Sequence, residues 1–248
     1  MTNEEKFQFD LQGYLVIKNV LSDDELAQLN AIADVEYHYD DLEQAEREYS
    51  VLPWGEAYKK LIDHPTVLPY MLDLVGETVR LDHDYCIFMS QGQCRGELHG
   101  GHGRDHWYEY RNGIMRNGLT VVTYFLNDSP EDAGGFACVP GSHKSNFNVG
   151  AIPDQVRSFS QPAHYVVQPV AEAGDVLIFT ESLMHGTMPW QAKTERRCVL
   201  YKYSPGYSSW ANNWYGNFCL GELTPQQQRL LAPPSVANHL PVLDKSDL

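Results

Sequence analysis

Residues 119–141, LTVVTYFLNDSPEDAGGFACVPG, contain the pattern that decides the fold. Two apolar runs, Leu119 to Leu126 and Phe136 to Val139, are rich in β-branched and aromatic residues. Turn residues, including Asp, Ser, Pro and Gly, separate and follow these runs, which is typical of strands. The stretch therefore predicts two strands joined by a turn-rich loop.

Similar short apolar runs continue on both sides, between Val79 and Tyr203. Many short strands with little helix between them favour an antiparallel sandwich or jelly roll over alternating βαβ units. We expect a mainly β core over about residues 79–203, with flanking helices at both ends. The further predicted strands are residues 13–17, Val79-Arg80-Leu81, Cys86 to Met89, Tyr165-Val166-Val167, Val176 to Phe179 and Cys198 to Tyr201.

Capping signals predict helices outside this core. Ser22 with Glu25, and Thr224 with Gln227, form the pattern in which the N-cap and N3 side chains satisfy each other's backbone N–H groups. A proline at the first helical position predicts another helix over about residues 65–75.

Length and charge limit the classes of function. A chain of 248 residues is expected to form one domain, residues 1–248. The 33 Asp and Glu against 18 Lys and Arg give a net charge of −15, which repels phosphate backbones and argues against a nucleic-acid polymer as partner. No apolar stretch approaches the roughly 18 residues of a membrane span, so no membrane partner is expected.

Cysteine usage and the first residues indicate a cytoplasmic protein. The 5 cysteines are odd in number and contain no CxxC pair, so we expect reduced thiols. The opening MTNEEKFQFD carries acids where a signal peptide carries bases. The oligomeric state does not follow from the sequence.

The histidines are the candidate metal ligands. His99, His102 and His106 have the spacing of a zinc site on a helix. The glycines among them would each cost a helix about 1 kcal/mol relative to alanine, so the segment reads better as a strand end running into a loop. Structural roles are expected for His38, His64, His143, His164 and His239, whereas His83 and His106 are undecided.

A strand-end histidine followed later by a second histidine and an arginine is the pattern that a non-haem iron site in a jelly roll needs. His185 follows the predicted strand Val176 to Phe179, and Arg196 begins the next strand. Together with His99, these residues can return to one cavity.

Over most of its length the sequence resembles the phytanoyl-CoA dioxygenase-like branch of the iron(II)/2-oxoglutarate-dependent oxygenases. The order and spacing of several stretches carry this resemblance. They are Phe9 to Ile17 with the helix that follows, Leu119 to Asp128, Gly134 to Lys144, Gly174 to Phe179, His185 and Arg196.

The resemblance implies a double-stranded β-helix in which Fe(II) is held by a His-X-Asp motif and a distal histidine, and 2-oxoglutarate binds to that iron. It assigns the metal to His99 and His185, and the far carboxylate of 2-oxoglutarate to Arg196. Thr187, two residues after His185 and on the same strand face, matches the usual hydroxyl partner. Arg197 is the alternative clamp if the register shifts by one residue. O2 and a small-molecule substrate complete the implied reaction.

The sequence departs from the family at the carboxylate, because His-X-Asp reads here as His99-Gly100-Gly101. Iron(II) prefers two imidazoles and one carboxylate with open positions beside them. Gly101 leaves that ligand position vacant, and a chloride ion would restore the missing charge. The change resembles the halogenase branch of the superfamily, in which a metal-bound halide is transferred to a substrate carbon. The first hypothesis is therefore an iron(II)/2-oxoglutarate-dependent halogenase that uses chloride.

Two alternatives stay open. The first is a hydroxylase with a displaced carboxylate ligand, either Asp105 or Glu97, which shares a strand face with His99 if the strand reaches that far. The second is a non-catalytic relative that binds a small molecule without iron. Intact His185 and Arg196 argue against loss of function.

The substrate class is less determined. The size of the chain favours a freestanding small molecule such as a nucleotide, an amino acid or an alkaloid-like natural product. Basic residues near the proposed site favour an anionic substrate such as a nucleotide; they are Arg95, Arg104, Arg111 and Arg116. An aromatic C-terminal stretch could line the pocket or pack on the barrel; it comprises Tyr203, Tyr207, Trp210, Trp214, Tyr215 and Phe218.

Overall fold

A computed structural model describes residues 1–37, 50–103, 106–211, 215 and 218–243. An antiparallel five-stranded sheet with the strand order β1-β7-β5-β9-β2 forms its base. The bounds are β1 Tyr14–Ile17, β2 Val79–Met89, β5 Thr120–Phe125, β7 Val176–Thr180 and β9 Arg196–Pro205.

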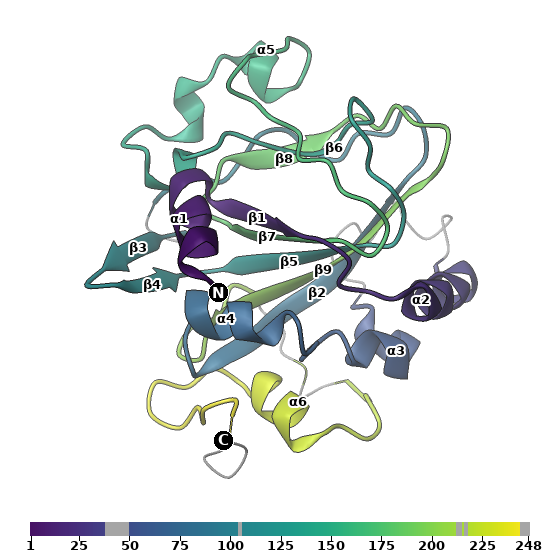
Figure 1. The fold of residues 1–248 in the computed structure, drawn as a ribbon, viewed down its shortest axis with the longest axis vertical. Helices are drawn as coiled ribbons and strands as arrows, with labels where there is room; N and C mark the ends of the chain where they lie inside the picture. The colour runs from purple at the N-terminus through teal and green to yellow at the C-terminus, as the bar shows by residue number, and fades with distance from the viewer. Residues whose placement is uncertain (38–49, 104–105, 212–214, 216–217, 244–248) are drawn as a thin grey trace.

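Two smaller antiparallel pairs complete the strands, β3 (Tyr108–Arg111) with β4 (Ile114–Asn117) and β6 (Gly135–Cys138) with β8 (His185–Met188). Figure 1 shows β6 and β8 lying over one face of the large sheet, while α4 and α6 lie on its opposite side. The fold is mainly β with flanking helices, the jelly-roll class predicted from the short strands. The site lies between the two facing sheets.

The helices agree in part with the capping signals. Ser22 with Glu25 and Thr224 with Gln227 form the predicted capping boxes of α2 and α6. A third capping box, Thr2 with Glu5, begins a helix, α1, that was not predicted from the sequence. The helices are α1 Asn3–Gln12, α2 Asp23–Glu36, α3 Glu56–Lys59, α4 Leu68–Leu74, α5 Asp154–Arg157 and α6 Pro225–Leu230, with 3-10 turns at Leu52–Trp54, Ser142–Lys144 and Val149–Ala151.

Three other expectations differ from the structure. The helix expected from residue 65 begins at Leu68, because residues 65–67 form a turn. The runs at residues 79–81 and 86–89 belong to one strand, β2, with a register shift between Leu81 and His83. The predicted strand at residues 165–167 contributes only a bridge from Val167.

The hairpin β3–β4 was not predicted, although its turn carries a recognisable signal. Asn112 and Gly113 have φ of 54° and 80°. Asn-Gly is the favoured pair for a two-residue hairpin turn, because both central residues need positive φ. The sheet also takes in β1, which lies outside the expected core of residues 79–203.

The two faces of the large sheet carry different cores. Alternate residues of a strand point to opposite faces. Tyr201 and Val199 belong to the cluster packed with the helices, whereas Cys198, Leu200 and Phe179 belong to the cluster between the sheets. The inner face therefore defines the barrel interior.

All five cysteines are free thiols, as the sequence predicts. No helix in the described part of the chain has the length and apolarity of a membrane span.

Candidate functional site

His99 and His185 face each other across a backbone bridge. The N–H of His99 donates to the carbonyl of His185 at 2.8 Å, and the reverse bond measures 2.9 Å. Residues directly opposite each other in an antiparallel pair place their side chains on the same face. The ring centroids are accordingly 4.4 Å apart. Two residues far apart in sequence thus form one imidazole pair, with His185 buried and His99 exposed.

Both imidazoles are held through the same ring atom. Nδ1 of His99 donates to the carbonyl of Glu97 at 2.8 Å, and Nδ1 of His185 donates to the carbonyl of Leu183 at 2.7 Å. Metal-binding histidines almost always donate the other ring N–H in this way, which fixes the tautomer and turns the second nitrogen to the metal. The lone pair of Nε2 is therefore available on each ring.

Burial keeps His185 neutral. The side chain is buried, and this burial lowers the pKa of His185 to about 4, although the carboxylate of Glu181 opposes the shift. A neutral imidazole is the form that binds metal.

The segment after His99 passes very close to the turn before His185. A Cβ on Gly100 would lie 2.7 Å from the carbonyl oxygen of Leu183 and 2.8 Å from that of Glu181. Gly100 also has φ of +77°. Only glycine fits this position without moving the backbone, so Gly100 permits the approach that pairs the histidines.

Gly101 lies in a non-extended backbone beside Met184. Its φ is +101°, and a Cβ there would lie 3.4 Å from Cγ of Met184. Residues 99 and 101 therefore do not share an extended strand face as they would in a regular strand.

Of the two carboxylates proposed as displaced ligands, only Glu97 lies in the described part of the chain. Asp105 lies outside the described residues. The Glu97 side chain is exposed, and its carboxylate lies 4.0 Å from Nη1 of Arg157. The structure thus directs Glu97 toward a surface arginine.

Arg196 is a buried cation on the inner face of β9. It is 3% exposed and pairs with Met89 of β2. Its Nη1 lies 3.8 Å from the sulfur of Met89, and its Nε has no hydrogen-bond partner among the described residues. Gly135 makes room for it, because a Cβ there would lie 2.8 Å from Nε. A buried charge without an anionic partner is costly, so the surroundings of Arg196 are suited to a carboxylate ligand.

Thr187 and Arg197 lie on different sides of the large sheet. Thr187 is buried on β8, two residues after His185, and pairs with Phe136, the neighbour of Gly135. Arg197 points to the opposite face, where it forms ion pairs with Asp34 and Glu195. Arg196 is thus the arginine that faces the interior.

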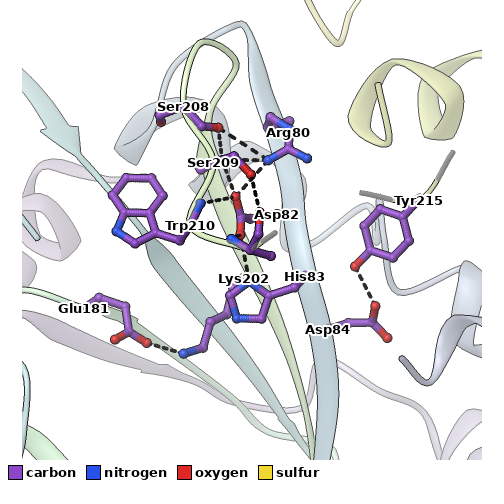
Figure 2. Close-up of polar contacts among 12 residues, drawn as sticks. Arg80, Asp82, His83, Asp84, Glu181, Lys202, Ser208, Ser209, Trp210 and Tyr215 are labelled. Atoms are coloured by element: carbon purple, nitrogen blue, oxygen red, sulfur yellow. Dashed lines mark hydrogen bonds and ion pairs between the residues drawn. The ribbon is translucent and has the colours of Figure 1, made fainter. Parts of the chain in front are cut away.

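Glu181 and Lys202 form a buried ion pair beside the histidines that sequence reasoning missed. Oε1 of Glu181 accepts from Nζ of Lys202 at 2.5 Å, and Oε2 lies 3.8 Å from Nε2 of His185 (Figure 2 shows the pair). Burial alone would raise the pKa of Glu181, but the charge and the hydrogen bond of Lys202 act against burial, and the pKa is lowered. The carboxylate is therefore ionised. A Glu four residues before the distal histidine was the available signal.

A second polar network anchors the chain after β9. Asp82, fully buried at the bulge of β2, accepts from Nη1 of Arg80 at 2.8 Å, from the backbone N–H of Trp210 at 3.0 Å and from that of Ala211 at 2.9 Å (Figure 2). Nδ1 of His83 lies 2.7 Å from Oδ2, the oxygen that also accepts from Ala211. This carboxylate therefore fixes the start of the aromatic segment.

The aromatic stretch does not act as one unit. Tyr203 is buried, and Tyr215 donates to Asp84 at 2.5 Å, so both pack on the outside of the large sheet. Trp210 stacks against His106 with centroids 6.2 Å apart. Tyr207 and Phe218 are exposed, and Trp214 lies outside the described residues.

The described arginines expected near the site lie on two segments. Arg95 approaches Tyr37, and Arg111 and Arg116 lie on the β3–β4 hairpin, which projects from the large sheet (Figure 1). Arg104 lies outside the described residues. The role of these arginines in binding an anionic substrate therefore stays a prediction.

The histidines assigned structural roles include one with clear partners. His143 is buried, and its Nε2 donates to the carbonyl of Asp10 at 3.1 Å. His38 lies outside the described residues. In the part of the chain that the structure describes, no three His, Cys, Asp or Glu side chains form a complete metal-binding group.

The donor set nevertheless fits the groups that the resemblance implies. Two imidazoles present free Nε2 atoms on one side of a backbone bridge. Arg196 presents an unpaired guanidinium nitrogen in the same interior. His99 and His185 would hold Fe(II), and Arg196 with Thr187 would hold a carboxylate of 2-oxoglutarate.

Comparison with solved structures finds the same fold in HygX from Streptomyces hygroscopicus. HygX with nickel and 2-oxoglutarate bound aligns with a TM-score of 0.77 and 22% identity, over 88% of this chain and 93% of HygX. HygX with iron bound gives 0.75 and 22% over the same shares. HygX with nickel, 2-oxoglutarate and hygromycin B bound gives 0.75 and 23%, again over 88% and 93%. At this identity the likeness shows the fold.

A comparison with curated proteins finds no significant match. The sequence itself, however, matches the profile of the phytanoyl-CoA dioxygenase (PhyH) family over residues 9–198. The match covers most of the chain, including His99, His185 and Arg196. The chain belongs to the phytanoyl-CoA dioxygenase family.

Proposed function

We propose that this protein is an iron(II)- and 2-oxoglutarate-dependent oxygenase that oxidises a C–H bond of a freestanding small molecule. The observation that carries the proposal is the bridged pair His99 and His185, in which both Nδ1 atoms donate to carbonyls and both Nε2 atoms remain free. Bound Fe(II) would supply the activation of O2 and of the 2-oxo acid.

The residues of the chain have separate tasks in this proposal. His99 and His185 orient the metal through the backbone carbonyls that hold their rings. Arg196 fixes one end of 2-oxoglutarate by a charge-assisted hydrogen bond, and Thr187 contributes a hydroxyl. Met89 and Trp190, which belong to one buried apolar cluster, would limit the access of water to Arg196.

Halogenation and hydroxylation are the two outcomes that this site can support. Gly101 favours halogenation, because position 101 contributes no carboxylate and a chloride ion could take the third position on the metal. A protein carboxylate from another position would favour hydroxylation. The group that occupies the third position therefore decides between them.

The substrate class remains part of the proposal. The neighbouring fold in HygX has been captured with hygromycin B, 2-oxoglutarate and nickel, which supports a small-molecule substrate and 2-oxoglutarate as co-substrate here.

The proposal is tested by co-substrate turnover without a known substrate. We expect the purified protein to convert 2-oxoglutarate slowly to succinate and CO2 when Fe(II), O2 and ascorbate as the reductant are present, and His185→Ala to abolish this. A screen of amino acids, nucleotides and alkaloid-like compounds, in chloride and in chloride-free buffer, would then identify accelerated turnover and its product by mass. No Fe(II)-dependent succinate above that of the variant would contradict the proposal.

A further inference from the structure

The carboxylate of Glu181 lies beside Nε2 of His185, and the inference built on it rests on the proposed iron site at His99 and His185. Oε2 of Glu181 lies 3.8 Å from Nε2 of His185. Nδ1 of His185 carries the ring proton, since it donates to a carbonyl, so Nε2 presents a lone pair. A carboxylate oxygen is also an acceptor only. Two acceptor atoms therefore face each other with no proton to join them, which is the arrangement that a cation fills.

The distance agrees with two ligands on one metal. Imidazole nitrogen and carboxylate oxygen each bind divalent metals at about 2.1 Å, so two such atoms lie about 3.0 Å apart at a right angle and about 4.2 Å apart on opposite sides. The observed 3.8 Å falls between these limits and is too long for a direct hydrogen bond.

The second oxygen of Glu181 is already held from behind. Nζ of Lys202 donates to Oε1 at 2.5 Å, and Lys202 in turn lies 5.4 Å from the ring centre of Tyr85. Carboxylates that bind metals are commonly hydrogen-bonded by such outer groups, which fix their orientation. His99, His185 and Glu181 are thus alike in one respect. In each side chain one polar atom, Nδ1 or Oε1, is held by a hydrogen bond, and the second, Nε2 or Oε2, is left to bind a metal.

The glycines after His99 gain a second explanation from this arrangement. Gly100 packs directly on the carbonyls of Glu181 and Leu183, and Gly101 turns its Cβ direction toward Met184. The tight approach brings the turn that carries Glu181 to the side of the imidazole pair. A carboxylate supplied by that turn would replace the one that position 101 lacks.

We propose that Glu181 is the protein carboxylate of this metal site, so that His99, His185 and Glu181 hold the iron and Lys202 positions Glu181. The three side chains do not form a closed group without an ion, so binding includes a side-chain adjustment that brings Oε2 onto the metal while Oε1 stays on Lys202. Two imidazoles and one carboxylate are the set that iron(II) oxygenases use. The third position is then filled by protein, and the reaction is hydroxylation.

Co(II) titration of the apoprotein under anaerobic conditions tests the assignment, with calorimetry for affinity and visible absorption for coordination. We expect Glu181→Gln to weaken Co(II) binding by at least about 100-fold, the upper end of the loss seen for outer groups, and to change the absorption bands. Glu97→Gln is the matched control, because it removes a neighbouring carboxylate that faces Arg157; it should keep wild-type affinity and bands.

A double variant without either buried charge serves as the control for misfolding. Glu181→Gln leaves Lys202 buried without its partner, so the double variant Glu181→Gln/Lys202→Met is measured beside it with thermal unfolding of both apoproteins. We expect the double variant to fold and to show the same loss of Co(II) affinity. Lys202→Met alone should lose about 10- to 100-fold, and Lys202→Arg should recover most of it, as expected for a positioning residue.

Each outcome separates this inference from the proposed function. Wild-type bands that stay the same in chloride, bromide and nitrate support a protein ligand, whereas bands that shift between the halides place a halide in the third position and overturn the role of Glu181. Wild-type Co(II) affinity and bands in Glu181→Gln would also overturn it. If His185→Ala loses Co(II) while Glu181→Gln does not, only Glu181 is wrong; if neither loses it, the iron site itself is wrong.

Discussion

Arg196 occupies the barrel interior because Gly135 has no side chain: a Cβ on Gly135 would lie 2.8 Å from Nε of Arg196. Gly135 has φ of +82° and belongs to β6, while Arg196 begins β9 on the opposite sheet. The contact joins the two sheets next to Phe136, which pairs with Thr187. It leaves a guanidinium group buried and directed at the space where 2-oxoglutarate is expected.

Replacing Arg196 should separate co-substrate binding from metal binding. Arg196→Met removes a charge-assisted contact worth about 1.5 to 3 kcal/mol, so the affinity for 2-oxoglutarate should fall by roughly 10- to 150-fold while Co(II) affinity is kept. The free energy of unfolding of the apoprotein should rise, because an unpaired buried charge is removed. Calorimetry and urea unfolding measure the two effects. Arg197→Met, whose partners are Asp34 and Glu195, is the control; if it weakens 2-oxoglutarate more than Arg196→Met does, the clamp is misassigned.

Gly100 should be intolerant of even one added carbon. Gly100→Ala places a Cβ within 2.8 Å of two carbonyl oxygens at a positive φ, so we expect a loss of about 1 to 3 kcal/mol in the free energy of unfolding from backbone strain alone, together with weaker Co(II) binding. Gly103→Ala is the control, since nothing lies within 4 Å of its Cβ position. Equal stability and metal affinity for the two variants would show that the approach of the two segments is not tight in solution.

The Asp82 network should contribute strongly to stability. Asp82→Ala leaves the fully buried guanidinium of Arg80 without its carboxylate, which costs about 3 to 5 kcal/mol when one partner of a buried pair is removed. Asp154→Ala breaks an exposed pair with Arg157 and should change stability by less than about 1 kcal/mol. Urea denaturation compares the two. A small effect at Asp82 would mean that solvent reaches Arg80.

The buried imidazole of His143 should make part of the stability depend on pH. Burial is the main cause that lowers the pKa of His143 to about 4, from an ordinary value near 6.5. The unfolded chain therefore binds more protons between these values, and stability is lost as pH falls from about 6.5 to 4, by about 3 kcal/mol for this group. His143→Gln should flatten this part of the curve of unfolding free energy against pH. An unchanged slope would show that His143 is protonated in the folded state.

The imidazole pair and the arginine could be predicted from the sequence, because they lie at fixed points of a recognisable strand order. His99 ends a segment interrupted by glycines, His185 follows an apolar strand, and Arg196 begins the next. Alternation along β9 then separates Arg196 from Arg197, but only the structure shows which of them faces the interior. The register of a strand depends on its neighbours, which a single run of residues does not contain.

Glu181 could not be predicted in the same way. Its role depends on a turn whose carbonyls pack on Gly100 and on Lys202 reaching across from β9, and both are contacts between segments distant in sequence. The sequence predicts an empty ligand position at Gly101. In the structure Gly101 has φ of +101° and lies beside Met184, so a glycine there also suits the path of the chain. The β3–β4 hairpin, by contrast, carried a local signal in Asn112-Gly113 that sequence reasoning can use.

The account is tested most directly by the visible spectrum of the protein with Fe(II) and 2-oxoglutarate under anaerobic conditions. A 2-oxo acid chelated to Fe(II) gives a charge-transfer band, and we expect this band in the wild type. His99→Ala and His185→Ala should each abolish it, and Arg196→Met should require a much higher concentration of 2-oxoglutarate to produce it. A band that persists unchanged in both histidine variants would contradict the assignment of the metal site to His99 and His185.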